Sequence, residues 1–146
     1  MNRGITILLF ALLSSISGFG QEWQFDLSIA KEKASEESKH IVLVFQGSDW
    51  CAPCMKLDRE IWSTDAFKNY AKDNFVMLQA DFPRRKANAL SESQGKSNAL
   101  LAETYNKRGI FPFVVVLDHN GKVLGETGYK KSTPEAYIAE LNSFIK

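Results

Sequence analysis

Apolar and polar residues alternate along the chain in blocks that predict four β-strands. Two mostly apolar runs, residues 41–45 and 75–81, have the length of strands buried on both faces of a sheet. A third run, residues 113–117, is rich in valine and follows a proline, which is tolerated only at the start or edge of a strand. Asn120-Gly121 then predicts a hairpin with a type I′ turn that leads into a fourth strand, residues 122–127.

Between these runs the apolar residues recur at helical spacing. The predicted helices cover residues 24–38, with Asp26 or Ser28 as the cap, residues 52–62, a short piece from Ala66 to Tyr70, a stretch from Asn98 to a stop at Gly109, and a last helix that begins at Thr133-Pro134-Glu135. Residues 84–97 are polar, and we expect only a short helix around residues 87–92. This order of elements predicts an α/β domain with a central mixed sheet flanked by helices.

The start of the chain has a different composition from the rest. A short basic opening with Arg3 precedes an apolar run over residues 5–16, and small residues follow up to Gly20. This pattern is typical of a secretory signal peptide, residues 1–20, cleaved before Gln21. The run is shorter than the ~20 apolar residues that span a bilayer, so no stable membrane insertion is expected after cleavage. Residues 21–146 then form a single domain in a periplasmic or secreted protein.

Charge narrows the choice of partners. The formal net charge is +1 for all 146 residues and zero without residues 1–20, where Arg3 is the only charged side chain. A near-neutral domain is not expected to bind nucleic acid or an anionic membrane as its main partner. The one basic run, Arg84-Arg85-Lys86, lacks interleaved aromatic residues, so we interpret it as a solvated loop.

The only two cysteines, Cys51 and Cys54, lie where the strand of residues 41–45 passes into the next helix. The first turn of a helix carries unpaired backbone N–H groups and the positive end of the macrodipole, so a thiolate is stabilised there. Free thiols titrate near ~8.5, and Cys-x-x-Cys thiols at such positions at roughly 3.5–7.5. Cys51 is therefore expected to be the exposed, ionised thiol, and Cys54, one turn deeper, the thiol that attacks a mixed disulfide on Cys51.

Three other interpretations of the cysteine pair are weaker. A structural disulfide across so short a loop constrains the unfolded chain by only about 2 kcal/mol. A zinc site normally needs four ligands, and the two histidines, His40 and His119, stand alone, so no metal is expected. Two buried cysteines acting only as small apolar residues do not explain their place between strand and helix. A redox-active dithiol is therefore the favoured interpretation of the pair, and no cofactor is expected.

The run Trp50-Cys51-Ala52-Pro53-Cys54 resembles the Trp-Cys-x-x-Cys centre of thioredoxin-like proteins. From Trp50 to Pro83 the chain is similar to exported bacterial thioredoxin-like domains and to the C-terminal domain of the membrane thiol:disulfide interchange protein. The resemblance covers residues 39–128. It implies a thioredoxin fold, protein disulfides as substrates and a membrane protein as the expected electron donor, because an exported dithiol must be kept reduced.

The resemblance also implies roles around the cysteines. Base rates favour a trans bond before Pro112, since cis occurs in about 5–6% of X-Pro bonds. In the family, however, a cis-proline at this point lies against the cysteine pair, and the residue before it pairs with the substrate. Pro112 and Phe111 are therefore expected to bind substrate, together with Trp50, for which a packing role alone is an equal alternative.

Ala52 and Pro53 are expected to set the direction of the reaction. They are similar to the Gly-Pro of reducing thioredoxins, and Pro53 removes an N–H that could stabilise the thiolate, which favours reduction. The competing functions are a disulfide isomerase or oxidase on the same fold, and a non-catalytic binding or chaperone module with a permanent disulfide.

One position departs from the family pattern. Thioredoxins carry a buried aspartate six residues before the first cysteine, where it moves protons for the resolving thiol, and this chain has Phe45 there. The sequence offers four carboxylates as substitutes and does not choose among them: Asp49, Asp58, Glu60 and Asp81.

Overall fold

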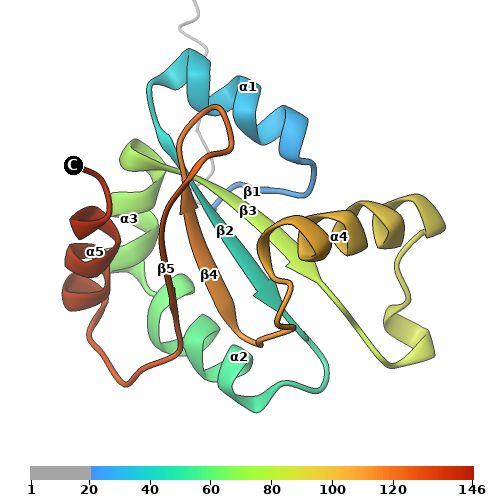
Figure 1. Ribbon diagram of the computed structural model, residues 1–146. Coiled ribbons are helices and arrows are strands. Elements are labelled where there is room, and N and C mark those ends of the chain that lie inside the picture. Colours follow the sequence, from blue (N-terminus) through green and yellow to red (C-terminus); the bar gives the residue numbers. More distant parts are fainter. Residues whose placement is uncertain (1–20) are drawn as a thin grey trace, which may run out of the picture.

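The computed structural model describes residues 21–146, which form a five-stranded sheet with helices on both faces (Figure 1). The expected signal peptide, residues 1–20, lies outside the described residues. In chain order the elements are β1 (Trp23–Gln24), α1 (Leu27–Glu37), β2 (His40–Gln46), α2 (Ala52–Leu57), the π-helix η1 (Asp58–Trp62), α3 (Asp65–Asn74), β3 (Phe75–Asp81), the 3-10 helix η2 (Lys86–Asn88), α4 (Glu92–Tyr105), β4 (Phe113–Leu117), β5 (Val123–Gly128) and α5 (Pro134–Ser143).

The sheet is mixed, with the strand order β1-β3-β2-β4-β5. β1, β3 and β2 run parallel, whereas β4 pairs antiparallel with both β2 and β5. β2 is therefore central, and its carboxyl end lies beside the end of β3 and the start of β4. This shared edge is where the loop to α2 begins. The sheet and flanking helices confirm the predicted thioredoxin fold.

Alternation along the strands divides the core into two layers. Val42 and Val44 point to one face and pack with α2, η1, α3 and α5, around Trp62 and Tyr137. The intervening β2 residues point to the opposite face, which α1 and α4 cover. Figure 1 shows this division, with α2, α3 and α5 on one side of the sheet and α1 and α4 on the other. The active-site helix is thus held against a large aromatic core.

The first helix begins later than predicted because a short strand precedes it. Trp23 and Gln24 pair with Met77 and Leu78 as β1, and α1 then begins after Asp26, whose carboxylate accepts from the Ile29 N–H at 2.9 Å. A strand of two residues has no periodicity that sequence analysis can detect. The cap at Asp26 is confirmed.

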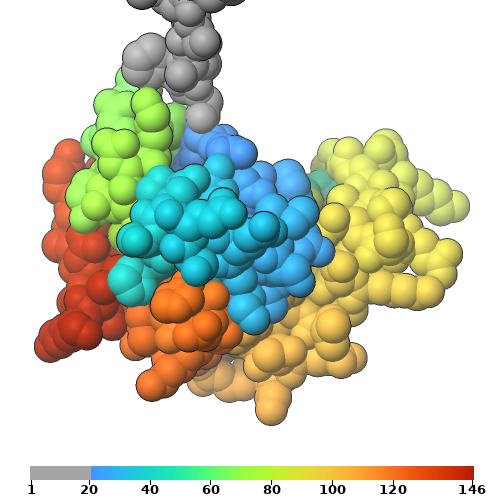
Figure 2. Space-filling model, turned by 90° about the horizontal axis from the view of Figure 1, so that it is seen from above, coloured from blue at the N-terminus to red at the C-terminus, as the bar shows by residue number. Residues whose placement is uncertain are grey.

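The prediction for α4 was wrong at both ends. The helix begins at Glu92, not Asn98, because Ser91 caps it by accepting from the Gln94 N–H at 3.2 Å. It ends at Tyr105 with Asn106 as the C-cap, and Gly109, with φ +62°, lies in the following loop. The short helix expected around residues 87–92 is the 3-10 turn η2 over residues 86–88. Residues 83–97 protrude from the side of the domain, drawn in yellow tones in Figure 2.

The β4–β5 hairpin is present, but its turn is not type I′. Gly121 is the only residue of the turn at positive φ (+85°), and its N–H donates to the Asp118 carbonyl at 3.0 Å. The Asp118 carboxylate also accepts from the N–H groups of Asn120 and Lys122. Aspartate at the first position favours a type I turn, followed here by glycine in the left-handed region.

Within residues 21–146 no helix is long and apolar enough to cross a membrane.

Candidate active site

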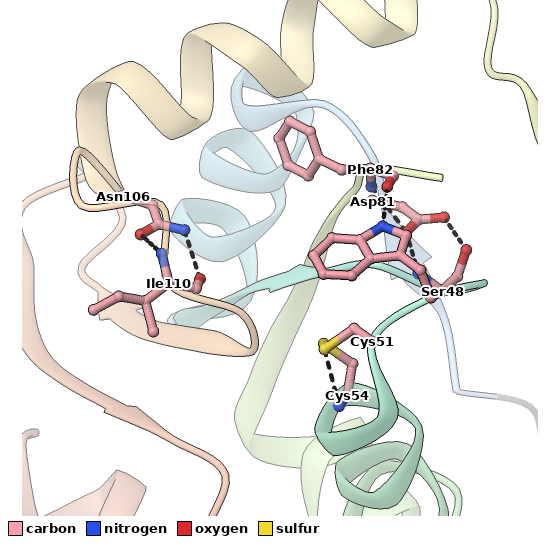
Figure 3. Close-up of a disulfide and its surroundings, with 8 residues drawn as sticks. Ser48, Cys51, Cys54, Asp81, Phe82, Asn106 and Ile110 are labelled. Carbon is pink, nitrogen blue, oxygen red and sulfur yellow. Dashed lines mark hydrogen bonds between the residues drawn. A yellow bond between two sulfur atoms is a disulfide. The ribbon is translucent and has the colours of Figure 1, made fainter. Parts of the chain in front are cut away.

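The two cysteines lie at the junction of β2 and α2, after the loop of residues 47–50. Cys51 has extended backbone angles and is the N-cap of α2, with Ala52 and Pro53 in the exposed first turn. The Cys54 N–H donates to the Cys51 sulfur at 3.3 Å (Figure 3). A helix N–H is therefore aimed at the sulfur that has to carry negative charge when reduced.

Cys51 and Cys54 are joined by a disulfide, so the structure shows the oxidised form. Both residues are 4% exposed. The expectation that Cys51 is the more exposed of the two cysteines is not met in this oxidised state, in which both residues are equally buried. Access to Cys51 then depends on the residues around it.

Trp50 is held in a fixed orientation beside the disulfide. Its indole N–H donates to the Phe82 carbonyl at 2.7 Å, and its ring meets the Phe111 ring edge-on with centroids 5.4 Å apart. A Cβ at Gly47 would overlap the Trp50 ring, so only glycine leaves room for this orientation. Sequence analysis placed Trp50 and Phe111 in one site, and the structure brings them together. It did not find Gly47 or Phe82.

The loop before β4 is braced by a buried asparagine. Asn106, 4% exposed, accepts from the Ile110 N–H at 3.0 Å and donates from its amide to the Ile110 carbonyl at 2.8 Å (Figure 3). The Phe111–Pro112 peptide bond that follows is cis, the geometry implied by the resemblance, and Pro112 is buried. Sequence analysis missed Asn106, for which its place after a helix was the only signal.

Asp81, at the end of β3, ties the strand to the active-site loop. Its carboxylate accepts from the Ser48 N–H at 2.9 Å, from the Ser48 hydroxyl at 2.6 Å and from the Phe82 N–H at 2.9 Å (Figure 3). Both oxygens are therefore engaged in holding the backbone around Trp50.

The remaining candidate carboxylates lie in different surroundings. Phe45 is fully buried against Phe113, with ring centroids 6.2 Å apart, so no acid lies at that position. Glu60 accepts from the Tyr129 hydroxyl at 3.0 Å. Asp58 lines a cavity of about 150 Å³ together with Cys54, and the other lining residues are Gln46, Ser48 and Met55. Asp58 is thus the candidate acid that shares a cavity with the second cysteine.

Asp49 holds the segment that follows β3. Its carboxylate accepts from the N–H groups of Arg84 and Arg85, each at 2.9 Å, and from the Asn88 side chain at 3.0 Å. These hydrogen bonds, first the one from the Arg84 N–H and then that from Asn88, lower the pKa of Asp49 to about 2. Its role is therefore to anchor the loop.

We expect the Asp49 anchor to make stability depend on pH in acid. A folded-state pKa of about 2, below the ordinary value of about 3.9, means that the contribution is complete above the ordinary pKa. It is lost as the pH falls toward 2. The difference in the free energy of unfolding between the protein and its Asp49→Asn variant should therefore narrow between about pH 5 and pH 2.

Asp73→Asn is the control, since Asp73 is exposed on α3 and its carboxylate makes no hydrogen bond within residues 21–146. This variant should show no such narrowing. Urea unfolding at a series of pH values measures both differences, and a constant Asp49→Asn difference down to pH 2 would contradict the anchor.

Among residues 21–146 no group of three histidine, cysteine, aspartate or glutamate side chains is close enough to hold an ion.

The chain is similar to known proteins in both sequence and fold. A family model described as thioredoxin-like matches residues 22–119. The disulfide bond reductase DsbH of Chlamydia pneumoniae is 32% identical over 131 residues, which make up 90% of this chain and 76% of DsbH. A solved structure of a DsbH oxidoreductase has a TM-score of 0.79 at 32% identity, over 86% of this chain and 85% of that one. A disulphide isomerase from Xylella fastidiosa Temecula1 has a TM-score of 0.60 at 19% identity, over 82% and 88% of the two chains, which shows the shared fold alone.

Proposed function

The chain belongs to the thioredoxin-like family, and from that premise we propose that it is an exported reductase of protein disulfides. It is a thiol:disulfide oxidoreductase whose reactive pair is Cys51 and Cys54. The observation that carries the proposal is the Cys51 sulfur at the start of α2, where it accepts the Cys54 N–H at 3.3 Å. Export of the protein and net reduction of its clients are both part of this proposal.

In the first step the Cys51 thiolate attacks one sulfur of a client disulfide. A bond forms between Cys51 and that sulfur, and the other client sulfur leaves as a thiolate that takes up a proton. The N–H of Cys54 and the start of α2 stabilise the attacking thiolate. The half-buried rings of Trp50 and Phe111 form the surface that holds the client segment during this attack, next to the buried Pro112.

In the second step the Cys54 thiolate attacks the Cys51 sulfur of the mixed disulfide. The client leaves as its second thiol, and Cys51–Cys54 becomes the disulfide seen in the structure. Two electrons pass from the protein to the client. A membrane electron donor then returns the pair to the dithiol, as an exported reductase requires.

Two features support reduction over oxidation. Pro53 lies in the first turn of α2 and lacks an N–H, so fewer donors stabilise the Cys51 thiolate. The disulfide is then more stable relative to the reduced pair, which favours reduction of the client. The relative with 32% identity is a disulfide bond reductase. The reduction potential tests this direction. A value closer to about −270 mV is expected for a reductase, and one near about −120 mV would indicate an oxidant.

Insulin reduction with wild-type protein tests the activity itself. Turnover with a potential near that of thioredoxin supports the proposal. Turnover of scrambled disulfides without net reduction would favour the isomerase. A disulfide that resists reduction, with client binding unaffected by replacement of both cysteines by alanine, would favour a binding module.

The second step needs an acceptor for the Cys54 proton, and Asp58 is the best placed carboxylate. It lies one turn after Cys54 on the same face of the helix, and it lines the cavity that Cys54 also lines. Asp81 and Asp49 are engaged by backbone N–H groups and hold loops instead.

We expect Asp58→Asn to slow release of the client by about tenfold or more, since general base catalysis typically contributes about 10²–10⁴-fold. The first step should change little. Stopped-flow measurement of mixed-disulfide formation and decay at a series of pH values separates the two steps. In the variant, the rise in the decay rate with pH should occur at a higher pH than in the wild type. Glu60→Gln is the matched control, because it removes a carboxylate that is hydrogen-bonded to the Tyr129 hydroxyl. This variant should release the client as fast as the wild type. Equal decay in the wild type and Asp58→Asn would exclude this role.

A further inference from the structure

An open hollow of about 660 Å³ lies beside Trp50, which directly precedes Cys51. Its walls come from the loop before α2, the segment after β3 and the loop before β4; the lining residues are Trp50, Phe82, Pro83, Arg84, Gly109 and Phe111. A volume of this size is within the range of ligand sites, about 300–1,000 Å³. Cys51 directly follows Trp50 in the chain, so the hollow begins one residue from the cysteine that attacks the client.

The inner wall of the hollow is aromatic and rigid. The Phe111 ring is in edge-on contact with both Trp50 and Phe82, each at a centroid distance of 5.4 Å. All three residues are only half-buried, so their rings offer apolar surface to a partner. A wall of this kind suits an aromatic or large apolar side chain, which gains both burial and edge-to-face contacts.

The rim of the hollow is positively charged. Arg84 lines the hollow. The two segments that supply most of the lining, residues 82–91 and 106–112, carry four further cations, Arg85, Lys86, Lys107 and Arg108, and no carboxylate of their own, while the Asp49 carboxylate lies against the backbone of Arg84 and Arg85. All five side chains are exposed. Within residues 21–146 only Arg108 among them forms an ion pair, with Glu126 at 3.7 Å. A domain with almost no net charge thus concentrates positive charge around this site.

The Arg84 side chain and the backbone on both sides of the hollow are held in position. The Arg84 guanidinium stacks on the Trp50 ring at 3.7 Å, and Asp49 holds the backbone N–H groups of Arg84 and Arg85. On the other side the Asn106 side chain braces Ile110 through two hydrogen bonds. A preorganised cation such as Arg84 loses little entropy when a carboxylate binds, so it contributes to selectivity.

We propose that this hollow selects acidic client segments: it receives an aromatic or large apolar side chain next to the target cysteine, while aspartate or glutamate neighbours meet the cationic rim. The inference rests on the proposed function and adds the chemistry of the client to it. It also revises the interpretation of Arg84-Arg85-Lys86 as a merely solvated loop.

Single-turnover reduction of short peptides tests the selectivity. Each probe is a symmetrical disulfide of a peptide with one cysteine, flanked by Phe and Glu, by Phe and Lys, or by Gly and Glu. Pre-reduced protein is mixed with each probe, and formation of the Cys51–Cys54 disulfide is followed by mass spectrometry. We expect the Phe/Glu probe to react about tenfold faster than the Phe/Lys probe at low salt, within the range of electrostatic steering. The Gly/Glu probe should be slower than the Phe/Glu probe.

Two perturbations should remove the charge preference. Raising the salt from about 0.01 M to about 1 M shortens the Debye length from roughly 30 Å to roughly 3 Å and should bring the Phe/Glu and Phe/Lys rates together. The triple variant Arg84→Gln, Arg85→Gln, Lys86→Gln should do the same at low salt. A control triple variant, Lys31→Gln, Lys122→Gln, Lys146→Gln, removes the same charge from α1, the hairpin tip and the carboxyl end, away from the rim, and should keep the preference.

A small uncharged disulfide, 2,2′-dithiodipyridine, distinguishes this inference from the proposed function. If wild-type protein reduces it and insulin but reacts equally with the Phe/Glu and Phe/Lys probes, the selectivity is refuted and the reductase stands. Equal loss of preference in both triple variants would also refute the rim as its source. If the wild type reduces none of these disulfides, the proposed function itself fails.

Discussion

Replacing Cys54 with serine is expected to turn the protein into a trap that stays bonded to its client through Cys51. The first attack needs only Cys51, whose sulfur lies at the start of α2. The second attack needs the Cys54 thiol, which a serine hydroxyl does not replace. Non-reducing gels of cells or extracts that contain the variant should show mixed disulfides that disappear with dithiothreitol, and insulin reduction should fall to background.

Cys51→Ser is the control for this trap, because it removes the attacking sulfur and should form no mixed disulfides. Mass spectrometry of the captured species would identify the clients directly. Full insulin reduction by both variants would show that the pair is not the reactive centre. Trapping through Cys54 in the Cys51→Ser variant would reverse the roles given to the two cysteines.

Trp62→Ala should produce the largest loss of stability, about 3–5 kcal/mol in the free energy of unfolding. Trp62 is 1% exposed at the end of η1, and its ring contacts the rings of Phe67, Tyr137 and Trp23 with centroid distances of 4.8, 5.4 and 6.3 Å. Truncation removes these contacts and leaves a cavity between the helical segment that carries the cysteines and α3 and α5.

Urea unfolding measures this effect as a lower transition midpoint. Leu100→Ala is the control, because Leu100 is 63% exposed on α4, and such surface changes usually stay within about 0.5 kcal/mol. A loss below about 1 kcal/mol for Trp62→Ala would mean that the aromatic cluster does not anchor the active-site helix to the sheet.

The elements that the sequence predicted well are those buried against the sheet. β2, β3 and β4 are short apolar runs between helical stretches. Such runs are typical of strands that are buried on both faces of a sheet. The last helix was predicted from Thr133-Pro134, and Thr133 caps it by accepting from the Ala136 N–H. The start of α4 was missed because its first turns consist of polar residues and show no apolar periodicity. The capping residue Ser91 was the only signal of a helix start.

The candidate site divides in the same way. Cys51, Cys54 and Trp50 were found because they lie together in the sequence at a strand-helix junction. The polar residues that hold the site were not, since their partners are distant in the chain. Asp49 meets Arg84 and Arg85, and Ser48 meets Asp81, through pairings that only the folded chain creates. Single-sequence spacing carries no information on such pairs.

The attachment points of the protruding segment, residues 83–97, have a consequence for how such proteins diversify. Asp49 fastens its first part through Arg84 and Asn88, and the Gln94 amide fastens its last part to the Phe25 carbonyl. Directly after the segment, the Asn98 amide donates to the Asp81 carbonyl. The few residues between these tethers carry no such link to the body of the domain. Because doubling a flexible loop costs only about 0.6 kcal/mol, insertions there are cheap. The segment can therefore be lengthened there without displacing the tethers that hold the active-site loop.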